Sequence, residues 1–308
     1  MIKLDCVTIE GPDLAGKTTL YNSIHKRTGF KWNIQDRAEL SMLCYSILYE
    51  RGDEDVWRRR LTETISNLNN RIIVLLPSWD ILEQRFKTRG DDVQTLESLR
   101  KLYAIFVRET EKIKNNSTVL LLTPVSEAEF QYDVINSIAW LSSRESDDSA
   151  WPARVAEEIK LNALTAPNKE CTPLRFRLEY KPADQEFDAS IMQHPPEEIY
   201  YANILKGVLS NIKDELDGKN DYGTPQTPFS TRRFIFTQDS CISLIHTMFR
   251  DNTMNVHVVC RSSDTVNTFE YDLKFLYYLT SRILAKSGVE PNDVQCRLYV
   301  TLNSAHVI

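Results

Sequence analysis

The feature that most constrains this chain is the glycine-rich segment EGPDLAGKTT at residues 10–19, which stands between an apolar run and a helical pattern. Its spacing, G-x-x-x-x-G-K-T, lets backbone N–H groups curl around a polyphosphate at the start of the next helix. Lys17 can then reach the β- and γ-phosphates, and Thr18 can ligate Mg²⁺. A chance match is the alternative, but the flanking strand and helix favour a phosphate-binding P-loop. The predicted ATP-binding residues are Gly11, Asp13, Ala15, Gly16, Lys17, Thr18 and Thr19.

Length and composition indicate a globular protein with two domains. The chain has 308 residues, of which 42% are apolar and 10% aromatic, enough for a core in each domain. Its net charge of −6 disfavours bulk attraction to nucleic acid, although a local basic groove would not show in that sum. Without a run of 18 apolar residues or a leader-like start, we expect no membrane span, no signal peptide and a cytoplasmic location. The six cysteines lack zinc-ligand spacing, so free thiols are expected.

Residues 1–142 alternate strand-like and helix-like segments, which is typical of an α/β domain with a parallel sheet and helices on both faces. The predicted strands are 2–9, 31–35, 71–76 and 118–122. The predicted helices are 17–27, 38–49, 54–69, 81–88, 96–114 and 127–141.

The polar segment 143–150 has no hydrophobic period and is predicted to be a linker. A second, α+β domain is then expected over 151–308. Its predicted helices are 197–216 and 271–287, and its predicted strands are 233–237, 242–249, 255–260 and 295–302.

Two charged motifs follow the P-loop. Asp36-Arg37 stands at the end of the second predicted strand, the edge at which doubly wound sheets place ligands, so the acid can hold Mg²⁺ or orient an acceptor hydroxyl. Arg37 can grip an acceptor phosphate. Arg85 and Arg89 share a helix face and can neutralise charge on a transferring phosphoryl group. A surface ion pair and an ordinary charged helix face are the respective alternatives.

Together, the P-loop, Asp36-Arg37 with Ser41 after it, and a lid-like run from Arg85 through Arg89 to Asp91 resemble the thymidylate kinase group of P-loop kinases over residues 1 to about 140. The resemblance implies Mg·ATP as donor and Asp13 close to the acceptor phosphate. It implies catalytic roles for Lys17, Asp36, Arg85 and Arg89. Only 19 positions separate Lys17 from Asp36, so the segment that closes over the acceptor in that family is missing. A modified nucleotide, or a base in DNA, is therefore also a candidate acceptor.

In the second half, Cys241 is followed by an apolar strand, a turn, a second strand and Arg261-Ser262-Ser263-Asp264. This order resembles the thymidylate synthase family, in which a cysteine thiolate adds to C6 of a pyrimidine monophosphate and activates C5 toward a folate-borne one-carbon unit. Residues 219–221 resemble its phosphate loop. The residues that the resemblance assigns to the substrate are Arg232, Arg233, Arg261, Ser262, Asp264, Asp272 and His306.

The resemblance leaves the second half's activity open. Asp272 stands where the synthases keep an amide, and a carboxylic group there matches the amino group of cytosine, as in the phage deoxycytidylate hydroxymethylases. The half is short, and two residues follow His306, so by this resemblance we expect no counterpart of the part that closes over folate in that family; folate is a possible cofactor only. The alternative is a reduced fold that binds nucleotide without turning it over, with Cys241 as a small core residue.

The combined expectation is an ATP- and Mg²⁺-dependent kinase of a pyrimidine deoxynucleotide, joined to a shortened synthase-like domain. Such a pairing suits a phage that modifies its DNA, in which case the location is the host cytoplasm. The synthase resemblance also implies a homodimer through the C-terminal domain. The rivals are a kinase of hydroxymethylated pyrimidines within DNA and a nucleotide-binding scaffold without catalysis.

Overall fold

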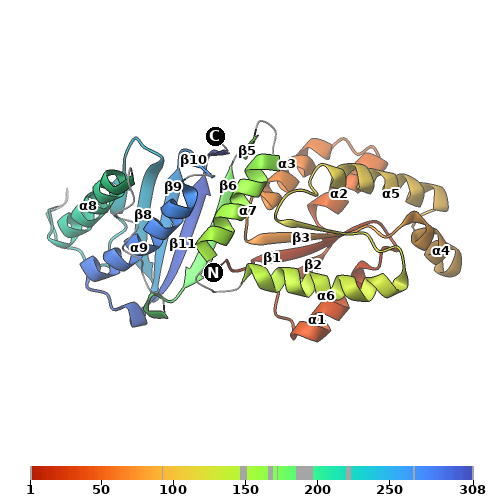
Figure 1. Cartoon of the computed structure of the whole chain (residues 1–308), viewed down its shortest axis with the longest axis horizontal. Helices are drawn as coiled ribbons and strands as arrows, with labels where there is room; N and C mark the ends of the chain where they lie inside the picture. The colour runs from red at the N-terminus through yellow and green to blue at the C-terminus, as the bar shows by residue number, and fades with distance from the viewer. Residues whose placement is uncertain are drawn as a thin grey trace. The chain divides into compact units, whose positions relative to one another are not determined.

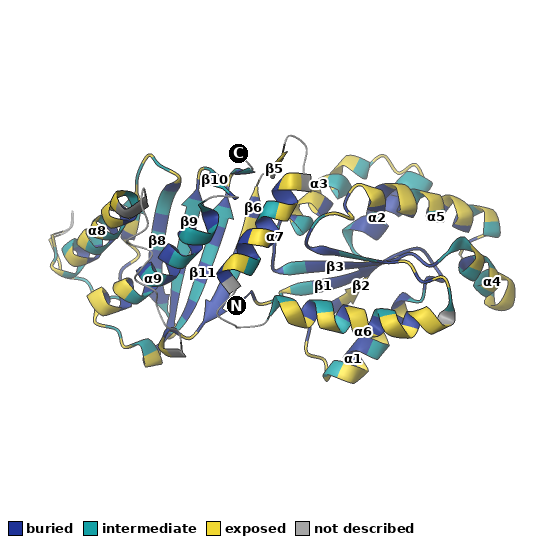
Figure 2. Cartoon of the chain, in the orientation of Figure 1, coloured by how far each residue is buried: buried dark blue, intermediate teal, exposed yellow. Residues whose placement is uncertain are grey.

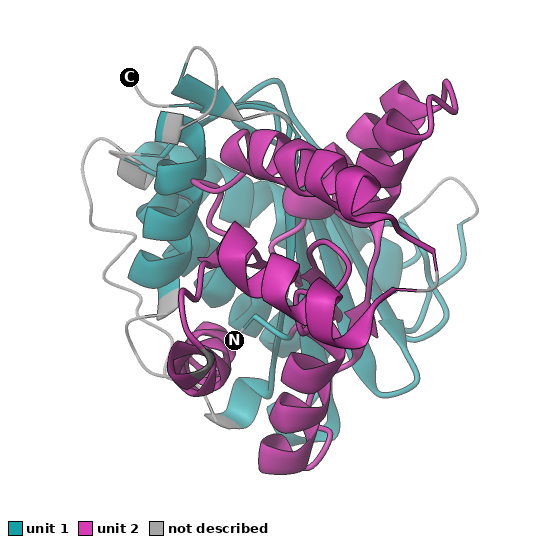
Figure 3. Cartoon of the chain, turned by 90° about the vertical axis from the view of Figure 1, so that its right-hand side faces the viewer, with its two compact units in different colours: residues 1–3, 147–308 teal, residues 4–146 magenta. Residues whose placement is uncertain are grey.

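The computed structural model describes residues 2–91, 93–145, 151–165, 169–171, 173–184, 197–219, 223–265 and 268–306. The chain divides into two compact units, one formed by residues 4–146 and the other by 147–308 together with 1–3 (Figure 3). Among the described helices, none combines the length and the apolar content needed to cross a membrane.

The unit 4–146 is built on a parallel four-stranded sheet in the order β2-β1-β3-β4. The strands are β1 (Cys6–Glu10), β2 (Ile34–Asp36), β3 (Asn70–Leu75) and β4 (Val119–Leu122). The helices are α1 (Lys17–Thr28), α2 (Glu39–Leu48), α3 (Glu54–Ile65), α4 (Trp79–Arg89), α5 (Leu96–Glu111) and α6 (Glu127–Arg144).

Two apolar cores cover the two faces of this sheet. Ile73 and Leu75 of β3 belong to the core that α1 and α6 close, whereas Ile72 and Val74 belong to the core under α2, α3 and α5. Figure 1 shows α1 and α6 on one side of the strands and α2 and α5 on the other. Because both faces are buried, β3 and β4 carry continuous apolar runs rather than alternating ones. The predicted parallel α/β sheet with helices on both faces is confirmed.

Several boundaries differ from the prediction: β2 begins at Ile34 rather than at 31, and α3 ends at Ile65 rather than at 69. The first strand was expected from residue 2, but β1 begins at Cys6, because Ile2 forms an antiparallel bridge with Leu178 of the other unit's sheet. The predicted linker 143–150 was wrong at its start, because α6 continues to Arg144. Glu145, which follows, is held by the indole N–H of Trp32 at 2.9 Å. Residues 146–150 of that linker lie outside the described part of the chain.

The second unit contains a mixed five-stranded sheet in the order β6-β11-β9-β8-β7, in which only β9 and β11 are parallel. The strands are β6 (Leu174–Tyr180), β7 (Phe234–Thr237), β8 (Ile242–Arg250), β9 (Thr253–Cys260) and β11 (Gln295–Leu302). A small sheet joins β10 (Ser263–Asp264), β12 (Ala305–His306) and β5 (Glu170–Cys171). The helices are α7 (Trp151–Thr165), α8 (Glu197–Leu216) and α9 (Phe269–Ser287), with short 3₁₀ turns η2 (Pro182–Asp184) and η4 (Pro291–Asp293).

Helices lie against one face of this mixed sheet. Every second residue of β11 is buried, as Figure 2 shows for this unit, and the ring of Phe176 on β6 contacts Phe269 on α9. The sequence prediction missed α7 and β6. The run 174–180 does alternate apolar and polar residues, a strand signal that the surrounding Pro- and Glu-rich composition obscured.

Candidate functional site

The segment between β1 and α1 forms a tight loop that only glycine can make at two points. Gly11 has φ +147°, and a Cβ there would lie 2.3 Å from the carbonyl oxygen of Leu75. Gly16 has φ +99° and is the N-cap of α1, where no side chain caps the helix. The first N–H groups of α1 are therefore left for an anion, and the helix dipole favours one there.

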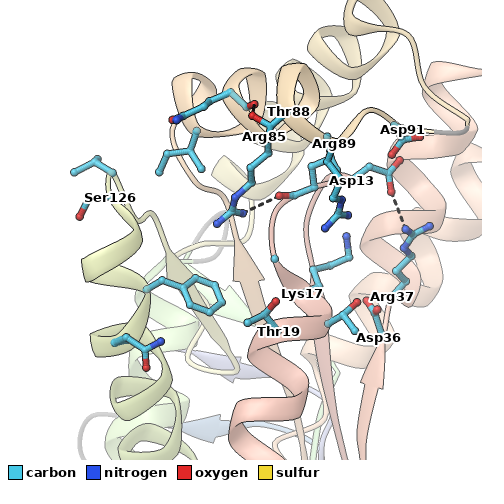
Figure 4. A pocket seen from close by; sticks show the side chains of 18 residues that line it. Asp13, Lys17, Thr19, Asp36, Arg37, Arg85, Thr88, Arg89, Asp91 and Ser126 are labelled. Atoms are coloured by element: carbon cyan, nitrogen blue, oxygen red, sulfur yellow. Dashed lines mark hydrogen bonds and ion pairs between the residues drawn. The ribbon is translucent and has the colours of Figure 1, made fainter.

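A cavity of about 720 Å³ opens in front of this loop, and Figure 4 shows the 18 residues that line it. They come from the P-loop, the β2–α2 turn, α4 with the residues after it, and the start of α6. Among the predicted residues, Gly11 and Ala15 belong to the loop but not to the lining. The predicted residues that do line the cavity are Asp13, Gly16, Lys17, Thr18, Thr19, Asp36, Arg37, Arg85 and Arg89.

Lys17 lies folded back over its own loop. Its ammonium donates to the carbonyl oxygens of Gly11 at 2.9 Å and Pro12 at 2.7 Å. Burial, and secondarily the Arg37 guanidinium, lower the pKa of Lys17 to about 8. At neutral pH it stays a cation, and a bound anion would hold it more firmly in that form.

Asp13 stands at the boundary of the cavity, with a partner on each carboxylate oxygen. Arg37 donates to Oδ1 at 2.7 Å, and the Tyr45 hydroxyl donates to Oδ2 at 2.6 Å. Burial and this carboxylate raise the pKa of Tyr45 well above its ordinary value, so its hydroxyl remains a donor. Arg37 adopts φ +68°, a left-handed conformation that is uncommon outside glycine.

The two lid arginines have different surroundings. The Arg85 guanidinium donates to the carbonyl oxygens of Leu14 at 2.8 Å and Ala15 at 2.9 Å, so it connects α4 to the P-loop. Arg89, one turn further along α4, is exposed on the cavity wall (Figure 4). The structure brings both to the cavity, as the sequence predicted, but only Arg85 is shown in contact with the loop itself.

Glu10 is the principal residue that sequence reasoning missed. It is fully buried at the end of β1 and accepts hydrogen bonds from the N–H groups of Ala38 at 3.0 Å, Leu40 at 3.1 Å and Ser41 at 3.1 Å. The Ser41 hydroxyl also donates to it. Burial raises the pKa of Glu10 to about 7 despite these hydrogen bonds. The available signal was an acidic residue at the end of a mostly apolar strand.

A second cavity of about 430 Å³ adjoins the first and shares Asp13, Arg37 and Asp91 with it. The rings of Tyr45 and Tyr49 stack with centroids 6.1 Å apart, and the Gln94 amide donates to the Tyr49 hydroxyl at 3.0 Å. The sequence predicted only Asp13 and Arg37 among its lining. The others are Met42, Tyr45, Tyr49, Arg51, Asp91, Val93 and Gln94.

The residues present fit Mg²⁺. The Thr18 hydroxyl and the Asp36 carboxylate belong to the lining of the larger cavity, and such oxygens are the ligands that Mg²⁺ prefers. Within the described ranges, no group of three or more His, Cys, Asp or Glu side chains could hold a metal. A site with one carboxylate is nevertheless typical of Mg²⁺ that also binds waters and substrate phosphates.

In the second unit, Cys241 is exposed between β7 and β8. Its sulfur is 3.9 Å from the Ser262 hydroxyl oxygen, and its carbonyl accepts from the N–H of Arg261 at 2.7 Å. The Arg261 guanidinium pairs with Asp239 at 2.6 Å. The predicted neighbours of the cysteine are thus brought together.

Three further predicted residues of this unit, Asp264, Asp272 and His306, lie on β10, α9 and β12. Asp264 and His306 are paired across parallel β10 and β12. Asp272 is buried on α9, where its carboxylate accepts from the hydroxyls of Tyr201 at 3.0 Å and Ser263 at 3.4 Å.

Arg232 and Arg233 lie at the opposite end of β7 from Cys241 and line a hollow of about 380 Å³. The structure therefore does not bring them to the same chain's cysteine. Of the predicted phosphate loop at 219–221, residues 220 and 221 lie outside the described part of the chain.

Comparison with known proteins adds no family to these observations: no family model matches the sequence, and no curated protein matches it.

Proposed function

We propose that the unit 4–146 transfers the γ-phosphoryl group of Mg·ATP to a pyrimidine deoxynucleotide. The observation that carries this proposal is the larger cavity, whose walls gather an uncapped helix N-terminus, Lys17, Asp36 and Arg89. A helix N-terminus and cations suit a polyphosphate, and an acid beside them suits metal binding or orientation of an acceptor hydroxyl.

The chain's own residues have separable tasks in this reaction. Thr18 and Asp36 would hold Mg²⁺, which would neutralise charge on the phosphate oxygens of ATP, and transfer of the γ-phosphoryl group leaves ADP. Lys17 exchanges its carbonyl partners for phosphate oxygens, and Asp36 orients the acceptor oxygen. Arg89 meets the charge that develops on the transferring group, and Arg85 keeps the loop in shape.

We assign the acceptor to the adjoining cavity. Its stacked tyrosines offer aromatic surface to a base, and Arg37 and Arg51 offer charge to a phosphate. Asp13 and Arg37, which line both cavities, then lie between donor and acceptor. A pyrimidine in DNA is the second candidate acceptor, because the rim residues Tyr49 and Val93 are 45% and 79% exposed and could accommodate a longer chain.

The decisive experiment offers labelled ATP with thymidylate, deoxycytidylate, their hydroxymethylated forms and base-modified oligonucleotides. We expect label on one acceptor class, lost in Lys17→Ala. Lys101→Ala is the matched control, because Lys101 is an exposed lysine that pairs with Glu97 away from both cavities. Retained transfer in Lys17→Ala contradicts the proposal. ATP binding without product from any acceptor favours the scaffold alternative.

For the second unit we propose binding of a pyrimidine deoxynucleotide beside Cys241. The exposed thiol, Ser262 and the Arg261–Asp239 pair support it. Tritium release from C5 of labelled dCMP or dUMP, abolished by Cys241→Ser, would show that the thiol is a nucleophile; binding without release would leave a binding module. A homodimer through residues 151–308 belongs to the same proposal, and sedimentation of the full chain tests it.

A further inference from the structure

The N-terminus of α2 is capped from a different element. Its N-cap residue, Ala38, has no side chain that accepts a hydrogen bond. The carboxylate of Glu10, at the end of β1, takes that place: Oε1 accepts from the N–H groups of Ala38 and Leu40, and Oε2 accepts from the N–H and the hydroxyl of Ser41. The N-terminus of α2 is therefore hydrogen-bonded to Glu10, the residue that immediately precedes Gly11 of the P-loop.

This attachment fixes the residue between β2 and α2. Arg37 has a left-handed backbone that persists only when its surroundings hold it. Its own N–H donates to the carbonyl oxygen of Ile9 at 3.0 Å, and the next N–H, of Ala38, donates to Glu10. Two consecutive residues of β1 thus hold Arg37 from both sides, and its guanidinium then lies 2.7 Å from Asp13.

We propose that Glu10 is a positioning residue for phosphoryl transfer. It holds Arg37 in its ion pair with Asp13, at the boundary between the two cavities. The inference rests on the proposed function. Glu10 lines neither cavity, so it acts through Arg37 rather than on a substrate. Asp36 is placed independently, because it is paired with Ile9 within the sheet.

The ionised form of Glu10 suits this role, because both oxygens accept from N–H groups. A glutamine would turn an NH₂ group toward the N–H of Ser41, so two donors would face each other. The charged and titratable groups around Glu10 are Glu39 and Lys17, with the buried Cys44 thiol. Desolvation opposes its ionisation and raises its pKa to about 7.

The test is a double-mutant cycle with Glu10→Gln and Arg37→Ala in the full chain. We expect Glu10→Gln alone to lower kcat/KM for the acceptor about 10- to 100-fold, since small misplacements of a positioning group have effects of this size. Its dissociation constant for a non-hydrolysable ATP analogue should stay nearly unchanged. In the Arg37→Ala background the same change should cost less than about threefold, because the residue through which it acts is absent.

Two controls separate positioning from stability. Glu109→Gln removes another buried glutamate of this unit, one that pairs with Arg58, Arg108 and Lys112 and lines neither cavity. It should lower stability without the change in kcat/KM. Ser41→Ala removes one donor to Glu10 and should give a smaller loss, so an informative variant remains if Glu10→Gln does not fold.

Amide hydrogen exchange at residues 37–41 gives a readout independent of activity, and should accelerate in Glu10→Gln. An equal loss of kcat/KM with and without Arg37, or a loss that Glu109→Gln reproduces, would overturn the inference. Unchanged exchange at 37–41 overturns it even if transfer is confirmed. If the wild type transfers to no acceptor, the proposed function fails, and the positioning role in transfer fails with it; accelerated exchange then leaves only a structural cap.

Discussion

Arg37 and Asp13 form an ion pair of 2.7 Å that joins the turn after β2 to the middle of the P-loop. The pair lines both cavities of the unit 4–146. Its two residues are 24 positions apart in the chain. The parallel pairing of β1 with β2 brings their segments together, because it places the two strand ends at one edge of the sheet.

The first prediction concerns the backbone of the P-loop. Gly11→Ala should destabilise the unit by at least about 3 kcal/mol, because strain at positive φ adds to a clash of the new Cβ with the carbonyl of Leu75. Gly29→Ala is the control: Gly29 also has positive φ, but nothing lies within 4 Å of its Cβ position, so about 1 kcal/mol is expected. Denaturant unfolding of both variants measures the difference. Equal losses would mean that the close approach to Leu75 is not limiting.

The second prediction separates the two lid arginines. Arg85→Gln should weaken ATP binding about 10-fold, because the carbonyls of Leu14 and Ala15 lose a charged donor worth roughly 1.5–3 kcal/mol. Arg89→Gln should leave ATP binding nearly intact and lower kcat by about 100-fold or more, as expected of a cation that meets charge only in the transition state. Calorimetry with an ATP analogue and steady-state kinetics distinguish the two patterns. Equal changes in ATP affinity and in kcat for the two variants would contradict these separate roles.

The third prediction concerns opposite pH dependences of stability for two buried glutamates. Burial raises the folded-state pKa of Glu10 to about 7 from 4.5. The contribution of Glu10 to the free energy of unfolding is therefore fully present below pH 4.5 and is lost as pH rises through 7. Burial alone would raise the pKa of Glu109 as well, but hydrogen bonds from Arg58, Lys112 and Arg108 hold it at about 2. The contribution of Glu109 to the free energy of unfolding is therefore present above pH 4.5 and is lost as pH falls toward 2.

Denaturant unfolding of each variant at a series of pH values measures how the free energy of unfolding changes with pH. Relative to wild type, Glu10→Gln should flatten the fall in stability between pH 5 and 8, a fall on the order of 3 kcal/mol for a shift of this size. Glu109→Gln should be most destabilising near neutral pH and least so near pH 3. A constant difference from wild type at every pH would contradict either assignment.

Local sequence patterns predicted the unit 4–146 well because β3 and β4 are short apolar runs and several of its helices begin at recognisable positions. Thr95, for example, caps α5 with Ser98 in a reciprocal pair. The same patterns placed Lys17, Asp36 and Arg89 on one cavity, since the carboxyl ends of parallel strands share an edge.

Contacts between distant elements were not predictable in this way. The link from Glu10 to α2 requires knowing that β1 ends beside the N-terminus of that helix. The connection from Arg85 to the P-loop requires knowing where α4 lies against it. In the second unit, the separation of Arg233 from Cys241 depends on which end of β7 each residue occupies, and the spacing of the motifs alone did not show this.

Asp13 has one further consequence. Its two oxygens are engaged by Arg37 and by Tyr45, and these side chains also line the cavity assigned to the acceptor. An acceptor that draws Arg37 toward itself would free Oδ1 of Asp13, and Asp13 also lines the cavity assigned to ATP. The order in which ATP and the acceptor bind, and inhibition by either product, should therefore depend on the Asp13 carboxylate.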